Sequence, residues 1–343
     1  MDTLESMLAP LRGRDGGAAV DIVADLARGA VALSDLIATA GKIGGIEEAT
    51  QRGGGGDVQA GLDVVADQIF LEAVSRAPVA VYGSEEMEHP MVLDRSAPYA
   101  LAIDPLDGSS NIHTNMAIGT IFSILPVAGD VDAAPGESFL QAGRSQVAAG
   151  FFVYGPQLTL ILTLGEGTHV FVHSPNAGGF VRTHAGITVP GTSAEFAINM
   201  SNYRHWDDAV RHYIDDCLSG AEGPHGRDFN MRWLGSMVAD AYRILVRGGV
   251  YLYPSDHRKG YTKGRLRLVY EANPLAMVME QAGGLATNGR APILDLVPGG
   301  LHERVPLVFG SHGEVSEIQR YHDDVAPAGV RSPLFGSRGL FRP

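Results

Sequence analysis

Two aspartates three residues apart, in a turn that follows an apolar run, are the residues of this sequence best suited to chemistry. The stretch Tyr99 to Asn111 reads Tyr-Ala-Leu-Ala-Ile-Asp-Pro-Leu-Asp-Gly-Ser-Ser-Asn. Asp104 and Asp107 can hold a hard cation, and the proline between them removes one backbone donor, so the Leu106 carbonyl is available as a further oxygen ligand. The residues that can receive an anion follow directly: Gly108, Ser109 and Ser110. Because these residue types also dominate ordinary turns, the stretch alone fits either a metal and phosphate site or a plain strand-to-turn junction.

Two other apolar segments also lead to acidic residues. Val79 to Tyr82 precedes Glu85 and Glu86, and a strand expected from Leu266 to Tyr270 runs into Glu271. Adjacent glutamates are typical of a solvated surface pair, but these lie at a strand end. If the three ends converge, five carboxylates would repel one another unless divalent cations lie among them. An all-oxygen set without a Cys/His cluster or a twelve-residue calcium loop favours two or more Mg²⁺ ions, for which Mn²⁺ can substitute.

Such a site suits the hydrolysis of a phosphate ester. This reaction needs an acceleration of up to ~10²¹-fold, whereas general acid-base catalysis supplies only about 10²- to 10⁴-fold. Two metals that clamp phosphate oxygens and activate a water can supply much of the remainder. The motifs of serine hydrolases, zinc proteases, P-loop enzymes and dinucleotide-binding proteins are absent from the sequence.

Composition limits the possible partners and the compartment. The chain has 343 residues, enough for two packed units, and 26 basic against 39 acidic residues give a net charge of −13. That balance argues against nucleic-acid binding, which depends on basic surfaces. No stretch approaches the 18 apolar residues of a membrane span. The single cysteine, Cys217, cannot form an intramolecular disulfide. We therefore expect a cytoplasmic protein with neither nucleic-acid nor membrane partners.

Hydrophobic spacing indicates the elements that must position these acids. Ala19 to Ala40 has the spacing of one or two amphipathic helices. Gly41 to Asp57, with four consecutive glycines, is expected to be a mobile loop, of the kind that either links elements or closes over an active site. A helix should follow, with Asp63 near its start.

Strands and helices then alternate through the rest of the chain. The expected strands are Ile118 to Pro126, Val147 to Tyr154, Leu158 to Leu164, Phe180 to Thr188, Phe196 to Asn199 and Val250 to Tyr253. The expected helices are one with Leu234, Val238, Ala241 and Leu245 on a single face, and one capped by Asn273. We predict an α+β fold, a layered α/β sandwich of two domains, residues 1–189 and 190–343, with a disordered tail from about residue 326.

These motifs match a known family. Asp-Pro-Leu-Asp-Gly-Ser at 104–109, together with Asn111 through Phe122, Arg267-Leu-Val-Tyr-Glu-Ala-Asn-Pro and Glu280-Gln-Ala-Gly-Gly, resembles class I fructose-1,6-bisphosphatase. That family belongs to the superfamily of metal-dependent, lithium-sensitive sugar phosphatases that includes inositol monophosphatase. The resemblance extends from about Asp57 to Gly289 and implies an active site at the junction of the two domains.

The resemblance also implies roles for individual residues around the reacting phosphate. The implied metal ligands are Glu85, Asp104, the Leu106 carbonyl, Asp107 and Glu271. Asp57 would lie on the mobile loop near the metals, and Asp63 with Glu86 would take the proton from the attacking water. The 1-phosphate would lie against the metals and the turn Asp107, Gly108, Ser109 and Ser110.

At the other end of the sugar, the resemblance implies a second group of ligands. The 6-phosphate would be held by Asn199, Tyr203, Tyr253 and Arg265. Met237 would line the sugar. Arg232 resembles an arginine that reaches into the neighbouring subunit's site, which implies a homo-oligomer, commonly a homotetramer.

The sequence departs from the family pattern at several positions. Arg265 stands where lysine is usual and keeps the charge with a different reach. Trp233 replaces a tyrosine and loses a hydroxyl, and His113 replaces an aspartate without an evident reason. Pro98 and Pro126 occupy positions where basic residues bind inhibitory AMP in some members, so AMP should inhibit weakly or not at all.

The expected activity is Mg²⁺-dependent hydrolysis of the 1-phosphate of fructose 1,6-bisphosphate to fructose 6-phosphate and phosphate, in gluconeogenesis or the Calvin cycle. The altered distal site leaves sedoheptulose 1,7-bisphosphate as an alternative or additional substrate. An alternative of another class is a regulator that binds metal and sugar phosphate without catalysis.

Overall fold

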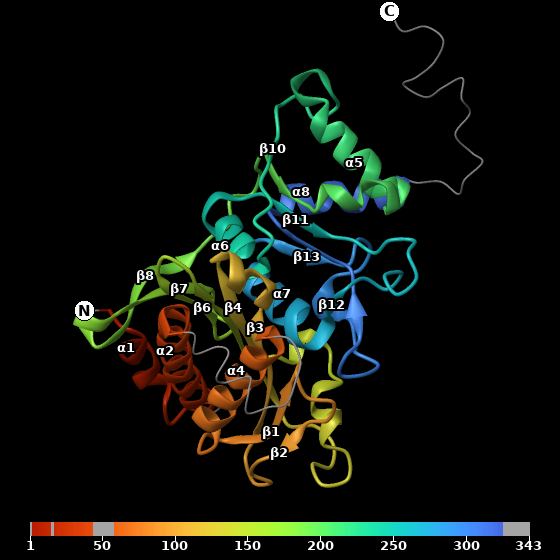
Figure 1. Cartoon of the computed structure of the whole chain (residues 1–343). Helices are drawn as coiled ribbons and strands as arrows, with labels where there is room; N and C mark the ends of the chain where they lie inside the picture. Colours follow the sequence, from red (N-terminus) through yellow and green to blue (C-terminus); the bar gives the residue numbers. More distant parts are fainter. Residues whose placement is uncertain (1, 15–16, 44–57, 325–343) are drawn as a thin grey trace, which may run out of the picture.

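The computed structural model describes residues 2–14, 17–43 and 58–324. Within these ranges the chain forms five layers: helices, an eight-stranded sheet, helices, a five-stranded sheet and helices (Figure 1). The α+β fold class predicted from the sequence is thus confirmed. The loop expected from Gly41 to Asp57 begins later than predicted, because α2 continues through Ile43. Its remainder, residues 44–57, and the tail from residue 326 lie outside the described residues, so the expectations of a mobile loop and of disorder stay predictions there.

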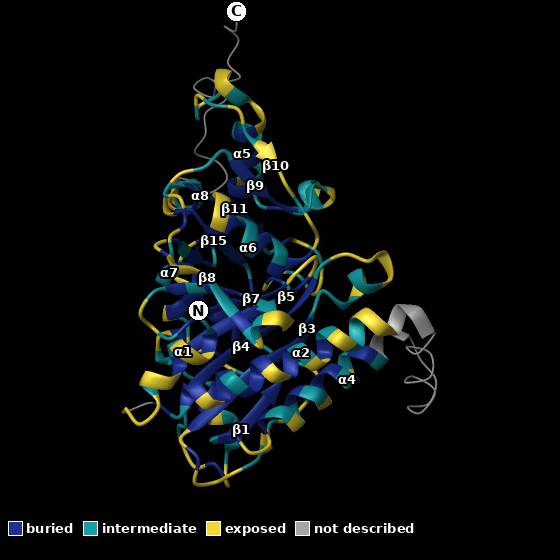
Figure 2. Ribbon diagram, turned by 90° about the vertical axis from the view of Figure 1, so that its left-hand side faces the viewer, coloured by how far each residue is buried: buried dark blue, intermediate teal, exposed yellow. Residues whose placement is uncertain are grey.

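The larger sheet has the strand order β2-β1-β3-β4-β5-β6-β7-β8. Only β1 and β3 pair in parallel; the remaining neighbours are antiparallel. Its strands are β1 (Val79–Ser84), β2 (Met91–Val92), β3 (Tyr99–Asp107), β4 (Ile118–Pro126), β5 (Ala148–Tyr154), β6 (Leu158–Thr163), β7 (Thr168–Ser174) and β8 (Gly179–Ile187). Strands β3 to β6 are buried almost throughout, because helices cover both faces (Figure 2).

Helices α1 (Leu4–Leu8), α2 (Ala19–Ile43) and α4 (Val58–Val74) pack on one face of this sheet. The sequence allowed one or two helices between residues 19 and 40, and the structure has one. On the other face lie α6 (Met237–Arg247) and α7 (Asn273–Gln281), which also contact the smaller sheet. These two helices therefore form the central layer between the two sheets.

The smaller sheet has the order β10-β9-β11-β15-β13. Its strands are β9 (Glu195–Ala197), β10 (Asn230–Met231), β11 (Val250–Tyr253), β13 (Leu285–Thr287) and β15 (Leu307–Gly310). Its outer face is covered by α5 (Asp208–Leu218) and α8 (His312–Asp324). As the alternation along β11 predicts, Tyr251 packs into the central layer, whereas Val250 and Leu252 pack toward α5 and α8. A separate pair joins β12 (Leu266–Arg267) and β14 (Arg304–Val305).

Several expected elements end or begin elsewhere. The helix expected to include Leu234 starts only at Met237, because Gly235 has a φ of 74° and interrupts it; Leu234 is exposed. The strand expected through Asn199 ends at Ala197, and Asn199 instead caps the short helix Met200–His205. Asn273 lies within α7 rather than capping it, because a helical turn precedes it without a break.

Gly119 determines how closely α6 can approach the larger sheet. A Cβ atom at this position in β4 would lie 2.4 Å from the Phe152 carbonyl oxygen and 2.6 Å from a methyl carbon of Val238. Because Gly119 pairs with Asp107, the same contact places the start of α6 beside the acidic turn.

Replacing Gly119 with alanine should therefore separate α6 from the sheet. We expect Gly119→Ala to lower the free energy of unfolding by about 1–3 kcal/mol, the usual cost of overpacking a core. A lower urea midpoint would show it. Gly136→Ala is the matched control, since its nearest atom would be 3.9 Å away, and its effect should stay within about 0.5 kcal/mol. Equal effects of the two substitutions would contradict the proposed packing constraint.

Candidate active site

A bulge in β3 brings Asp104 and Asp107 to the same side of the sheet. Asp104 pairs with Ile121 and Asp107 with Gly119, so β3 has one residue more than β4 across this interval. In a regular strand, residues three apart point to opposite faces, and the extra residue of a bulge reverses that relation. Pro105 favours the irregularity because it cannot donate to the ladder. The Thr120 hydroxyl donates to the Pro105 carbonyl at 2.9 Å and holds the bulge in place.

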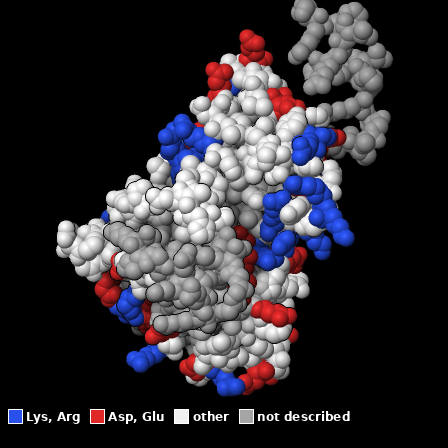
Figure 3. Space-filling model, in the orientation of Figure 1, with Lys and Arg blue, Asp and Glu red and all other residues white. Residues whose placement is uncertain are grey.

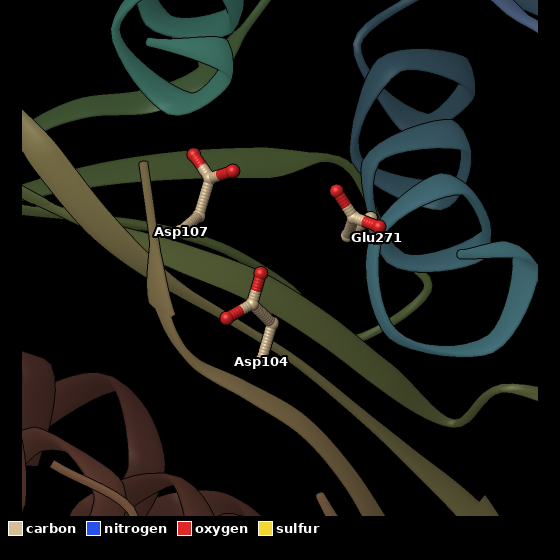
Figure 4. A group of neighbouring side chains, drawn as sticks. All are labelled: Asp104, Asp107 and Glu271. Atoms are coloured by element: carbon tan, nitrogen blue, oxygen red, sulfur yellow. The ribbon is translucent and has the colours of Figure 1, made fainter. Parts of the chain in front are cut away.

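Glu271 completes a cluster of three acids. Carboxylate oxygens of Asp104, Asp107 and Glu271 all lie within 4.8 Å of one another, and Figure 4 shows the three side chains pointing toward one another from β3 and from the chain segment that enters α7. The predicted strand Leu266 to Tyr270 is wrong beyond Arg267. The chain instead forms a π-helical turn, Leu268–Ala272, which positions Glu271 over the cluster.

Burial makes these acids hard to ionise without a cation. Burial raises the pKa of Asp104 well above its usual value, and nearby carboxylates, Glu85 first, raise it further. Burial likewise raises the pKa of Glu271 well above its usual value, with the charge of Glu85 adding to the effect. Burial raises the pKa of Asp107 to about 7, although a hydrogen bond from the Val238 N–H opposes the shift. A divalent cation among the three oxygen donors would relieve this strain, so the residues present fit such an ion.

Glu85 lies beside this cluster and has a cationic partner. Arg267 Nε donates to Glu85 Oε1 at 3.0 Å, and the Arg267 backbone N–H donates to the Glu271 carboxylate. Arg267 therefore connects Glu85, which follows β1, with Glu271 of the π-helical turn. In the sequence, Arg267 appeared only as part of a motif and was given no role. Its position four residues before Glu271 was a local signal for that contact alone, and nothing local indicated the contact with Glu85.

Asp63 and Glu86 form a further pair of acids next to this cluster. Burial raises the pKa of Asp63 to about 6, partly opposed by a hydrogen bond from the Ser109 side chain. Burial also raises the pKa of Glu86 to about 7, and the negative charge of Asp63 is the next largest cause. Asp63 Oδ1 is buried without a hydrogen-bond partner among the described residues. Carboxylates with a pKa near neutrality can accept and release protons at physiological pH.

The turn after Asp107 has the geometry expected of an anion site. Gly108 has a φ of 79°, a left-handed conformation that favours glycine, and it starts the 3₁₀ helix Ser109–Thr114 that also contains Ser110. Asn111 Nδ2 donates to the Gly235 carbonyl at 2.8 Å. Leu106 is buried in the bulge, where its N–H donates to Asp104 Oδ1 at 3.0 Å. The hydrogen bond from Asn111 to Gly235 thus fastens this turn to the loop that precedes α6.

A small pocket at the carboxyl end of β11 contains three of the four residues implied for the distal phosphate. Asn199, Tyr253 and Arg265 line it. Tyr203 is not among its lining residues; its hydroxyl donates to Asp215 Oδ1 at 2.7 Å. Asn202, which had no predicted role, lines the pocket instead.

The remaining predicted residues lie apart from this pocket or outside the described residues. Met237 is buried at the first position of α6. The half-exposed Arg232 follows β10, and its Nε donates to Glu195 Oε1 at 3.1 Å. Asp57 lies outside the described residues.

No helix in the described part of the chain is long and apolar enough to cross a membrane.

The sequence matches two family models along most of its length. The model described as "Fructose-1-6-bisphosphatase, N-terminal domain" matches residues 15–185, and "Fructose-1-6-bisphosphatase, C-terminal domain" matches residues 189–323. The chain belongs to the fructose-1,6-bisphosphatase family. A curated relative, fructose-1,6-bisphosphatase class 1 of Rhizobium meliloti (strain 1021), is 55% identical over 344 residues, which cover 99% of each chain. A second class 1 relative, from Nitrobacter hamburgensis, is 52% identical and covers 99% of this chain and 98% of its own.

Solved structures of the fructose-1,6-bisphosphatase family share the fold described above. The Leishmania major fructose-1,6-bisphosphatase in holo form has a TM-score of 0.82 and 32% sequence identity, covering 94% of this chain and 98% of its own. The apo form of the same enzyme gives a TM-score of 0.78 at 32% identity, covering 90% and 94%. The resemblance found from the motifs is therefore confirmed along nearly the whole chain.

The raised pKa values predict how metal and pH act together on stability. A carboxyl group whose folded pKa is raised stabilises the fold below its unfolded pKa of about 4, and this contribution is lost as pH rises through the folded pKa. Metal-free protein should therefore lose stability as the pH rises from about 4 to about 7, through the values of Asp63, Glu86 and Asp107. A bound cation removes this loss, so Mg²⁺ should raise Tm more at high pH.

Thermal melts with EDTA or saturating Mg²⁺, at about pH 5.5 and about pH 8, measure this difference. We expect the increase in Tm caused by Mg²⁺ to be larger at the higher pH by at least about 3 °C. An increase that is equal at both pH values, or larger at the lower pH, would contradict the electrostatic account.

Proposed function

We propose that this protein hydrolyses the 1-phosphate of fructose 1,6-bisphosphate, yielding fructose 6-phosphate and inorganic phosphate. The observation that carries the proposal is the cluster of Asp104, Asp107 and Glu271 beside the protonatable pair Asp63 and Glu86, within a chain 55% identical to a class 1 fructose-1,6-bisphosphatase. A plain strand-to-turn junction would not concentrate five acids with so few basic partners.

In this proposal, divalent cations are held by Asp104, Asp107, Glu271, Glu85 and the Leu106 carbonyl. Asp57, which precedes the described residues of α4, is proposed as a catalytic residue near the cations. Mg²⁺ is the proposed ion, and Mn²⁺ can substitute, because every donor is a hard oxygen. When bound, the cations neutralise phosphate oxygens and make a water nucleophilic. Arg267 contacts both Glu85 and Glu271 and so fixes their positions relative to each other.

The pair Asp63 and Glu86 has the role of moving the proton. The unpaired Asp63 Oδ1 is available to accept a hydrogen bond from the attacking water. With pKa values of about 6 and about 7, the pair can take that proton and release it to solvent near neutral pH. The serines and backbone N–H groups of the turn 108–110 orient the 1-phosphate.

The distal phosphate lies, in this proposal, in the pocket of Asn199, Tyr253 and Arg265, with Met237 along the sugar. Tyr203 would contribute only if its hydroxyl leaves Asp215.

We propose that Arg232 completes the site of a neighbouring subunit in a homotetramer and that the protein is cytoplasmic. We further propose a division into two domains near residue 189. The boundary between the two family models and the gap between β8 and β9 support it.

Phosphate release measured across sugar bisphosphates, with and without Mg²⁺, tests the proposal. We expect Mg²⁺-dependent release from fructose 1,6-bisphosphate, and sedoheptulose 1,7-bisphosphate measured in parallel gives the substrate preference. Asp104→Asn should lower kcat by at least about 10³-fold, since it removes one charged metal ligand.

The same variant carries its own structural control. Asparagine retains the oxygen that accepts from the Leu106 N–H, and it removes a buried negative charge. In EDTA at about pH 8, Asp104→Asn should therefore be at least as stable as the unmodified protein. Near-normal turnover, or unfolding of the metal-free variant, would contradict the assignment. Binding of metal and ligand without phosphate release would indicate a regulator instead.

Inhibition by AMP is expected to be weak or absent. Pro126 pairs with Tyr99 at the end of the β3 and β4 ladder, and the Pro98 carbonyl accepts from the Val127 N–H, so neither proline supplies a cation to a nucleotide phosphate. Titration of the phosphate-release assay with AMP should change the rate by less than about twofold at 1 mM (a tenfold effect there would correspond to a Kd of roughly 0.1 mM). Strong, cooperative inhibition would show that the nucleotide binds through other residues.

A further inference from the structure

The pocket at the end of β11 contains two asparagines whose amide orientation is determined by their neighbours. Asn199 Oδ1 accepts from the Ser201 N–H at 3.2 Å and from the Ser201 hydroxyl at 2.6 Å. Asn202 Oδ1 accepts from Arg258 Nη2 at 2.9 Å. A guanidinium has donors only, so the Asn202 atom facing Arg258 must be the oxygen. The Nδ2 group of Asn202 is then left as a donor for the pocket that this residue lines.

The other polar groups of the pocket also favour an anion. Arg265 supplies a permanent positive charge, and Tyr253 supplies a hydroxyl. Asp256 also lines the pocket and would repel a phosphate, but its carboxylate is occupied by Arg258, whose Nε lies 3.1 Å from both oxygens. The pocket therefore offers donors on several sides, with its one carboxylate already paired.

Arg258 is held in place by the loop that carries it. The Arg258 N–H donates to Asp256 Oδ1 at 2.9 Å, and the Asp256 N–H donates to the Tyr261 carbonyl at 3.1 Å. The guanidinium carbons of Arg258 and Arg265 lie 5.0 Å and 3.7 Å from the centre of the Tyr261 ring. Both arginines are thus ordered around one ring beside the pocket.

The same loop is anchored and positively charged in an otherwise acidic protein. Gly264 has a φ of 84°, and a Cβ there would lie 2.3 Å from the backbone of Val305, so the loop packs directly on β14. Lys259 and Lys263 are exposed on it. Figure 3 shows Lys and Arg side chains gathered on the flank where the β11 to β12 connection lies in Figure 1. The charge favours the approach of an anionic ligand to this end of the site.

We infer that Asn202 binds the phosphate at the far end of the sugar bisphosphate through its Nδ2 group, and that Arg258, paired with Asp256, is the residue that positions it. This inference rests on the proposed function and refines it. Asn202 takes the place in the pocket that the sequence had assigned to Tyr203, whose hydroxyl is bonded to Asp215.

Asn202→Asp is the sharpest test, because the two side chains have the same shape. Aspartate keeps an oxygen toward Arg258, but it replaces the donor that faces the pocket with a negative charge. Calorimetric titration of the Mg²⁺-loaded protein with fructose 6-phosphate, which carries only the distal phosphate, should show Kd raised at least about tenfold. KM for fructose 1,6-bisphosphate should rise similarly, with kcat changed less than about twofold. Turnover of fructose 1-phosphate, which lacks the distal phosphate, should not change.

Two further variants separate this role from general effects. Thr262→Asp adds the same charge at an exposed position of the loop and should change Kd for fructose 6-phosphate by less than about threefold. Arg258→Lys keeps one charge, but a compact ammonium cannot serve both Asp256 and Asn202 as a guanidinium does. The affinity of Arg258→Lys for fructose 6-phosphate should therefore lie between the affinities of the unmodified protein and of Asn202→Asp.

The outcomes also distinguish the inference from the proposed function. Unchanged affinity of Asn202→Asp for fructose 6-phosphate, or an equal loss with fructose 1-phosphate, would overturn the role of Asn202. If the unmodified protein released no phosphate from fructose 1,6-bisphosphate, the proposed function would fail. The calorimetric comparison would still decide whether Asn202 binds a sugar phosphate. Asn202→Ser, which retains a small polar group, tests the same point should Asn202→Asp not fold.

Discussion

The repulsion among buried carboxylates is the constraint on which the rest of this structure depends. Asp104, Asp107 and Glu271 have their oxygens within 4.8 Å of one another, and Glu85 adds a further charge beside them. One guanidinium, from Arg267, contacts Glu85. In a low-dielectric site, that arrangement favours protonated acids until divalent cations bind. Affinity for metal and the raised pKa values therefore have the same physical origin.

The two sheets and the central helical layer hold these charges together. The bulge at Pro105 and Leu106 puts both aspartates of β3 on one side, and the π-helical turn before α7 brings Glu271 to them from the other half of the chain. Gly119 allows α6 to approach, and Asn111 fastens the phosphate turn to the loop before that helix. The site thus draws on both halves of the molecule, and its geometry depends on the packing between them.

Much of the site could be predicted from sequence, because apolar runs that end in acids are local signals. Asp104, Asp107 and Glu271 were found that way and do converge. The π-helical turn could not be predicted, since Leu268 to Tyr270 is as apolar as a buried strand and only its packing on the cluster decides the conformation. Arg267 and Asn202 were missed for another reason. Their roles arise from hydrogen bonds to residues that are distant in sequence, Glu85 and Arg258, and no local pattern records such contacts.

Diffraction from crystals grown with Mn²⁺, measured at the manganese absorption edge, would show whether the clustered carboxylates bind divalent cations. Manganese scatters anomalously, accepts the same oxygen ligands as Mg²⁺, and would locate each ion independently of any activity. We expect at least two anomalous peaks, each within about 2.5 Å of carboxylate oxygens from Asp104, Asp107, Glu271 or Glu85. Crystals that contain manganese elsewhere, or none at all, while these acids remain unliganded would show that the carboxylate cluster is not a metal site.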